Sequence, residues 1–89
     1  MKMQDKLVIK IKRKSEIIKQ IGISKSTLHA RINQKLLPPP IQLGARAVGF
    51  LQHEIDTVLA AMIAGNTNKE IKLLVNELVA KRSLLAYGH

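Results

Sequence analysis

The sequence predicts a mostly α-helical fold with a small β-hairpin wing, that is, a winged helix-turn-helix followed by an added C-terminal helix. Three observations predict it: two short helical segments flank a glycine, three consecutive prolines follow the second segment, and a β-compatible stretch then precedes further helical patterns. A chain of 89 residues has room for one small domain, and the absence of cysteine excludes disulfides and thiolate metal sites.

The N-terminal half carries the whole positive charge. Eleven of the 15 Lys and Arg residues and only two of the six acidic residues lie in residues 1–46, so the net charge of +9 belongs to that half. This asymmetry favours nucleic acid binding over two alternatives, an anionic membrane surface and an ordinary solvated basic face. No apolar run reaches the length of a membrane span, and no signal-peptide core follows the N-terminus. We therefore expect a cytoplasmic, nucleoid-associated protein with no membrane partner.

Residues 1–14 are predicted to form a basic arm that contains a strand at 6–12. In this strand the apolar residues Leu7, Ile9 and Ile11 alternate with an outer face that is largely basic. The charge run at the end of the arm either contacts phosphates or keeps an edge strand soluble, and the charge asymmetry favours phosphates. The residues of this run are Lys10, Lys12, Arg13 and Lys14.

Residues 15–65 are predicted to form the winged helix-turn-helix. A short helix at 15–20 is followed by Gly22, which can adopt the positive φ that a tight turn between helices needs. Ser24 is a good N-cap for a second helix, and we expect the three prolines to end that helix. Two helices joined by a glycine turn within about twenty residues have helix-turn-helix spacing.

The second helix has a narrow apolar stripe, so its opposite face is predicted to be exposed. Counting about 100° per residue from Leu28 and Ile32 places Ser26, Ala30 and Asn33 farthest from the core. Small and polar side chains on such a face suit insertion into a DNA major groove, although an ordinary surface helix has the same pattern. Thr27 and His29 flank this face and are predicted to contact phosphates or base edges. The flanking cations Lys25, Arg31 and Lys35 are predicted to contact phosphates.

The stretch after the prolines predicts a hairpin with Arg46 at its tip. Two short β-compatible runs, 41–43 and 47–50, are joined by a glycine-containing turn. An arginine at such a tip suits a narrow minor groove or the DNA backbone, whereas a solvated turn residue or a structural ion pair is the alternative.

Helical spacing of apolar residues predicts two more helices. The first runs from about 52 to 64 and stops at Gly65. Residues 66–89 are predicted to form a C-terminal amphipathic helix, because Thr67 and Glu70 occupy capping-box positions ahead of a long apolar stripe. This helix either packs back on the N-terminal strand or mediates dimerisation.

The segments GISKSTLHARI and LPPPIQLGARAVGF, followed by EID, resemble the AlpA prophage regulatory proteins, which are related to MerR-type and excisionase-type DNA-binding domains. The resemblance covers about residues 15–64 and implies a winged helix-turn-helix that binds DNA. The chain departs from the family pattern at four positions. His29 stands where relatives carry an aromatic residue and Ala30 where they carry Arg, while Leu37 replaces Phe and Phe50 replaces Trp. The family's base contacts therefore do not transfer residue by residue.

No metal, cofactor or catalytic site is predicted, and we expect no enzyme activity. The three histidines, at 29, 53 and 89, are far apart and lack metal-binding spacing. The six acidic residues form no evident pair, and no glycine-rich phosphate loop follows a strand.

These features predict a sequence-specific DNA-binding protein with its second helix in the major groove and its wing in the minor groove. It would act as a phage-type transcriptional regulator or as an excisionase-like recombination factor. Double-stranded DNA is the expected partner, with a homodimer or cooperative oligomer on DNA, a recombinase and the transcription machinery as further candidates. The alternative is a protein-interaction adaptor that acts through the C-terminal helix. RNA binding is disfavoured because Phe50 and Tyr87 are the only aromatic residues.

Overall fold

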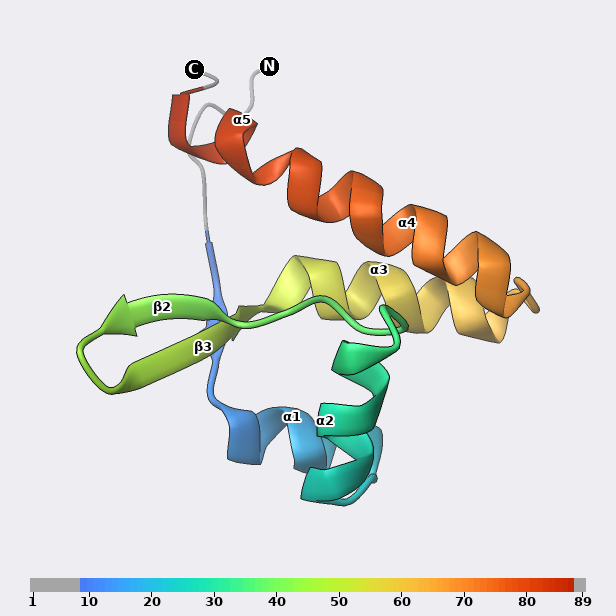
Figure 1. Ribbon diagram of the computed structural model, residues 1–89, viewed down its shortest axis with the longest axis horizontal. Coiled ribbons are helices and arrows are strands. Elements are labelled where there is room, and N and C mark those ends of the chain that lie inside the picture. Colours follow the sequence, from blue (N-terminus) through green and yellow to red (C-terminus); the bar gives the residue numbers. More distant parts are fainter. Residues whose placement is uncertain (1–8, 88–89) are drawn as a thin grey trace, which may run out of the picture.

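The computed structural model describes residues 9–87 and confirms the predicted fold class (Figure 1). It has a small antiparallel sheet of three strands, with α1 and α2 below it and α3 and α4 above it in Figure 1, while the hairpin of β2 and β3 projects to the left. The elements in chain order are β1 (Ile11–Lys12), α1 (Lys14–Ile21), α2 (Lys25–Asn33), β2 (Ile41–Gly44), β3 (Ala47–Leu51), α3 (Gln52–Ile63), α4 (Asn68–Ala80) and α5 (Arg82–Tyr87).

The sheet has the strand order β1-β3-β2, and both pairings are antiparallel. Strands β2 and β3 form the predicted wing, a hairpin whose turn is Ala45 and Arg46. Gly49 in β3 is required by the close approach of its neighbours, because a Cβ there would lie 2.5 Å from Ile11 Cγ2 and 2.9 Å from Leu43 Cδ1. The wing therefore packs tightly where it meets β1.

The helix-turn-helix forms through the local chemistry that the sequence predicts. Gly22 adopts a left-handed φ of 80°, and its N–H donates to Ile18 O at 2.8 Å. The Ser24 hydroxyl then accepts a hydrogen bond from Thr27 N at 3.1 Å and caps α2. These two contacts fix where α1 ends and where α2 begins.

The prediction that the prolines end the second helix is wrong. Helix α2 ends at Asn33, and Lys35 takes the left-handed conformation with a φ of 65°. The N–H of Lys35 donates to Ile32 O at 3.1 Å and that of Leu36 donates to Arg31 O at 2.9 Å, which is a Schellman motif with Lys in the position that glycine usually occupies. Leu36 and the buried Leu37 therefore precede the prolines as an irregular link.

The core joins elements from α1 to α4. Its buried members are Ile17, Leu28, Leu37, Phe50, Ile55, Val58, Ile71 and Val75. Helix α4 lies along α3 and contributes the last two of these residues (Figure 1). A hydrophobic core that takes side chains from α4 depends on this helix for its completeness.

Two further predictions need correction. The C-terminal segment is not one helix, because Lys81 forms a turn between α4 and α5, and α4 packs on α3 rather than on the strand. In the arm, β1 is much shorter than the predicted strand at 6–12, of which residues 6–8 lie outside the described residues, as does His89. Ile9 and Ile11 remain 44% and 39% exposed, so their side of the arm borders an open pocket and not the core.

Candidate nucleic-acid interface

The outward face of α2 carries the side chains that were predicted to lie there. Ser26, Ala30 and Asn33 are exposed, whereas Leu28 on the opposite face is fully buried. The Asn33 amide makes no hydrogen bond to any residue between 9 and 87. Its two donors and its acceptor oxygen are therefore available to a partner outside the fold.

Side-chain hydroxyls in the first turn of α2 are held by hydrogen bonds within the protein. The Ser24 hydroxyl donates to Thr27 Oγ1 at 2.9 Å and lies 3.2 Å from Ser26 Oγ. Thr27 is also half-buried. These contacts hold the hydroxyls of Ser26 and Thr27 at the N-terminus of the helix, whose unpaired N–H groups favour an anion such as phosphate.

The basic arm reaches the exposed face of α2 through one contact. Lys14 Nζ, at the start of α1, lies 3.2 Å from His29 Nε2 in the middle of α2. This contact brings the predicted site residues Lys14 and His29 together although they are 15 residues apart. Lys14 therefore adds a cation beside the outward face of α2.

The other cations of the predicted site differ in exposure. Arg13, Lys25 and Lys35 are exposed, whereas Lys12 and Arg31 are half-buried. Lys12 Nζ is 3.9 Å from Glu16 Oε2, and at this distance and exposure the pair is weak. Glu16 Oε1 also accepts from Arg13 N at 2.7 Å, so this carboxylate is held as part of the cap of α1.

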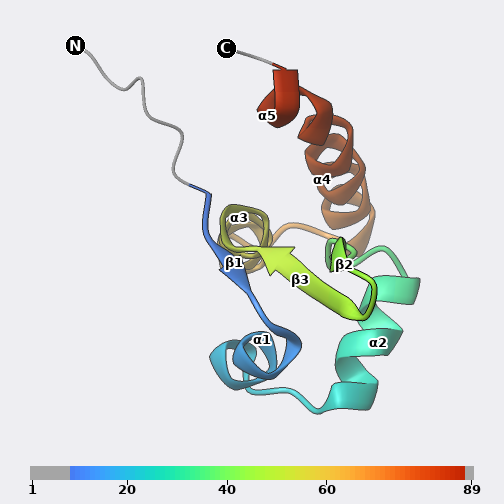
Figure 2. The ribbon, with the colours of Figure 1, turned by 90° about the vertical axis from the view of Figure 1, so that its left-hand side faces the viewer.

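The wing carries Arg46 at its tip, in the turn between β2 and β3. The turn overlaps α2 in Figure 2, but Figure 1 shows that it projects away from α2, at the left end of the molecule. Arg46 is exposed and forms no ion pair within the described part of the chain. Gln42 Nε2 donates to Gly44 O and braces the turn that carries it.

A buried ion pair behind the wing was missed by the sequence analysis. Arg82 Nε donates to Glu54 Oε2 at 2.8 Å, and Arg82 Nη2 donates to Glu54 Oε1 at 2.6 Å and to Pro39 O at 2.7 Å. Glu54 is only 1% exposed. The position of Glu54 in the sequence was the one available signal of this ion pair. Glu54 comes three residues after Leu51 and four before Val58, so it lies on the apolar stripe of its helix, where a carboxylate needs a partner.

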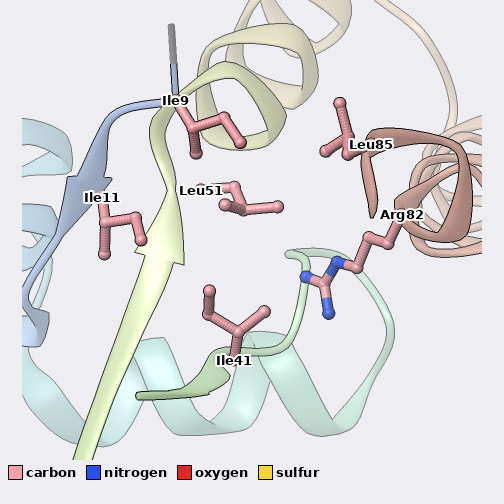
Figure 3. A pocket seen from close by; sticks show the side chains of 6 residues that line it. All are labelled: Ile9, Ile11, Ile41, Leu51, Arg82 and Leu85. Carbon is pink, nitrogen blue, oxygen red and sulfur yellow. The ribbon is translucent and has the colours of Figure 1, made fainter. Parts of the chain in front are cut away.

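The pocket beside this ion pair is open and almost entirely apolar. It has a volume of about 290 Å³, and Figure 3 shows Ile41, Leu51 and Leu85 around it, with the Arg82 guanidinium at one wall. Across residues 9–87, no group of three or more His, Cys, Asp or Glu side chains could hold a metal ion. No helix in the same range is long and apolar enough to cross a membrane.

The comparison with known families identifies this arrangement. Residues 10–61 match the family described as the prophage CP4-57 regulatory protein (AlpA), and this segment runs from β1 into α3. No curated protein and no solved structure matches the chain. Helices α4 and α5 lie beyond the matched segment, although α4 completes the core. Since the match spans more than half of the 89 residues, the chain belongs to the AlpA family of prophage regulatory proteins.

Proposed function

We propose that this protein is a sequence-specific DNA-binding regulator that places α2 in the major groove and the tip of the wing in the adjacent minor groove. The observation that carries the proposal is the exposed, small and polar outward face of α2, which lies in the segment that matches the AlpA family. Double-stranded DNA is the partner, and the protein acts in the cytoplasm, in association with the nucleoid.

The residues of the site divide into two groups by what they offer to DNA. Asn33 is suited to pair with adenine in two-pronged fashion, and the Ala30 methyl group to meet a thymine methyl. The cations hold phosphates, which position the protein without reading sequence. They are Lys12, Arg13, Lys14, Lys25, Arg31, Lys35 and, at the minor groove, Arg46.

Salt dependence tests the electrostatic part of the proposal. If about six phosphates are neutralised, the logarithm of the association constant falls with the logarithm of salt concentration with a slope of about −5. The slope is measured by titrating a bound duplex at several salt concentrations. A slope near zero would remove the phosphate contacts from the proposal.

Substitutions separate sequence reading from phosphate binding. Asn33→Ala is expected to change which duplexes are selected from a random pool, because it removes a base contact. Lys25→Ala is expected to weaken all duplexes alike and to reduce the salt slope by about one. The exposed α4 residues Asn76 and Lys72 supply matched controls, Asn76→Ala and Lys72→Ala, which leave selection unchanged. Equal effects of the first two variants would show that α2 does not read bases.

Two activities fit the same DNA contact. A transcriptional regulator changes the output of a promoter that contains the selected sequence, whereas an excisionase-like factor changes the yield of a recombination reaction at attachment sites. In vitro transcription and excision assays on templates carrying the selected sequence distinguish them. The length of the protected footprint shows whether one copy, a dimer or a cooperative array occupies the DNA.

A protein-interaction adaptor is the second candidate function, and exposed apolar residues on the C-terminal helices favour it. Leu73 on α4 is 61% exposed and Leu84 on α5 is 63% exposed. Deletion of residues 66–89 does not test this candidate, because it also removes Ile71 and Val75 from the core. The double variant Leu73→Ser, Leu84→Ser keeps the core intact. Loss of DNA binding in this variant would show that DNA binding needs an oligomer formed through these residues, whereas retained binding supports the winged helix as the DNA-binding part. An unchanged protein that binds no duplex would favour the adaptor.

A further inference from the structure

Arg82 connects the two ends of the wing hairpin. Pro39 lies two residues before the start of β2, and Glu54 lies three residues after the end of β3. One guanidinium, at the start of α5, donates hydrogen bonds to both, at 2.6 to 2.8 Å. The base of the hairpin is therefore closed by a residue that comes 28 positions after Glu54 and 43 positions after Pro39.

The link between α2 and the wing lacks backbone N–H groups where its three prolines lie. Pro38, Pro39 and Pro40 have no N–H to donate, so this segment cannot be tied through its own backbone donors. Burial of Leu37 and Pro38 anchors its first part, and the bond from Arg82 to Pro39 O holds its second part. Pairing with β1 and burial of Phe50 hold the β3 end of the hairpin, whereas Arg82 holds the other end, where the chain enters β2.

The chemistry of these contacts requires arginine at this position. The Glu54 carboxylate is buried and accepts from two different nitrogens of the same planar group, which also reaches a backbone carbonyl. A lysine ammonium is a single point of charge and does not reproduce this fork geometry. Lys81 forms a turn between α4 and α5, and Leu85 on α5 lines a pocket together with Leu51 (Figure 3).

We infer that Arg82 is a positioning residue for DNA recognition, which fixes the orientation of the wing relative to α2. Through it the helices beyond the family-matched segment control how Arg46 meets the duplex. The DNA part of this inference rests on the proposed function, whereas the orientation of the wing is measurable without DNA.

Spin labels measure the orientation directly, because the chain has no cysteine of its own. The substitutions Gln34→Cys, after the end of α2, and Ala45→Cys, in the turn of the wing, both fall at exposed positions and carry one label each. We expect a narrow distance distribution in the otherwise unchanged protein and a broad or shifted one in Arg82→Met. Lys81→Met removes one charge at the adjacent exposed position and is expected to leave the distribution narrow.

A second variant keeps the test decisive if Arg82→Met fails to fold. Glu54→Leu, Arg82→Met removes the buried charge together with its partner, which folded proteins tolerate, and it still lacks the bond to Pro39. A narrow, unshifted distribution in any folded variant without Arg82 overturns the inference. Circular dichroism identifies which variants are folded.

The coupling to DNA is measured by a double-mutant cycle. We expect Arg46→Ala to weaken duplex binding about tenfold in the unchanged protein and less than about twofold in the Arg82→Met background. An equal factor in both backgrounds overturns the DNA part of the inference, because a merely structural role for Arg82 leaves the contribution of Arg46 intact. If the unchanged protein binds no duplex, the proposed function fails, while the spin-label distances still decide whether Arg82 fixes the wing.

Discussion

Removing the guanidinium of Arg82 is predicted to destabilise the whole fold. In Arg82→Met, the carboxylate of Glu54 stays 1% exposed and loses its partner. Breaking a buried ion pair from one side generally costs about 3–5 kcal/mol. The Arg82 side chain is itself 21% exposed, so water replaces part of the lost interaction and we expect the lower end, about 3 kcal/mol.

Urea unfolding followed by circular dichroism measures this loss. For a small domain whose unfolding free energy changes by about 1.5 kcal/mol per molar urea, a loss of 3 kcal/mol moves the midpoint down by about 2 M. The double variant Glu54→Leu, Arg82→Met is expected to recover most of the loss, because no buried charge remains. What it does not recover is the hydrogen bond to Pro39 O, which contributes about 1 kcal/mol.

The order of the two variants decides whether this reasoning holds. If Arg82→Met loses less than about 1 kcal/mol, or if the double variant is less stable than the single one, the carboxylate does not depend on the guanidinium. Lys81→Met serves as the control, because it removes a positive charge from the neighbouring exposed position and is expected to shift the midpoint little.

Three more predictions concern the backbone and the caps. Lys35→Gly relieves a left-handed residue with a φ of 65° and is expected to raise stability by about 1 kcal/mol in urea unfolding while weakening duplex binding; a loss of stability would contradict it. Gly49→Ala places a Cβ 2.5 Å from Ile11 Cγ2 and should lower the melting temperature by several degrees, so an unchanged melt would refute the close approach. Thr67→Ala removes the hydroxyl that accepts from Glu70 N at 3.2 Å and should cost about 1 kcal/mol in urea, whereas Thr67→Asp should restore most of it.

The features that the sequence predicts correctly depend on neighbours in the chain. Gly22 and Gly65 have left-handed φ values of 80° and 88°, and Ser24 and Thr67 accept the capping bonds expected of them. Each of these signals needs only a few consecutive residues, because the side chain or the missing Cβ acts on its own turn. The pattern of exposure on α2 was predictable for the same reason, since it follows from helical geometry alone.

The end of α2 shows where local signals fail. Lysine has no preference for the left-handed conformation, so the residue type at position 35 does not predict the Schellman motif. The chain turns there because Leu37 and Pro38, just beyond, are buried in the core and pull the link inward. Packing therefore overrides the intrinsic preference of one residue, and that information is distributed over the fold.

The contacts between residues far apart in the sequence could not be predicted, because no pattern in the sequence links the two partners. Glu54 and Arg82 are 28 residues apart, and Lys14 and His29 are 15 apart, so no periodic pattern relates the members of either pair. The acid on the apolar stripe of α3 indicated that Glu54 needs a partner. It did not indicate which of the 15 basic residues provides it.

The acidic residues of the C-terminal half, residues 47–89, balance its basic residues in number. Most acidic residues of the neutral half are engaged inside the fold: Glu54 binds Arg82, Asp56 accepts from Gln52 at 2.7 Å and from Gln20 at 3.2 Å, and Glu70 accepts from Thr67 N at 2.7 Å. Of these three carboxylates only Glu54 has a cationic partner, whose charge offsets its own at close range, whereas neutral N–H groups fix Asp56 and Glu70 in place. Since its basic and acidic residues are equal in number, the second half completes the core and holds the wing without changing the net charge of +9 that residues 1–46 carry.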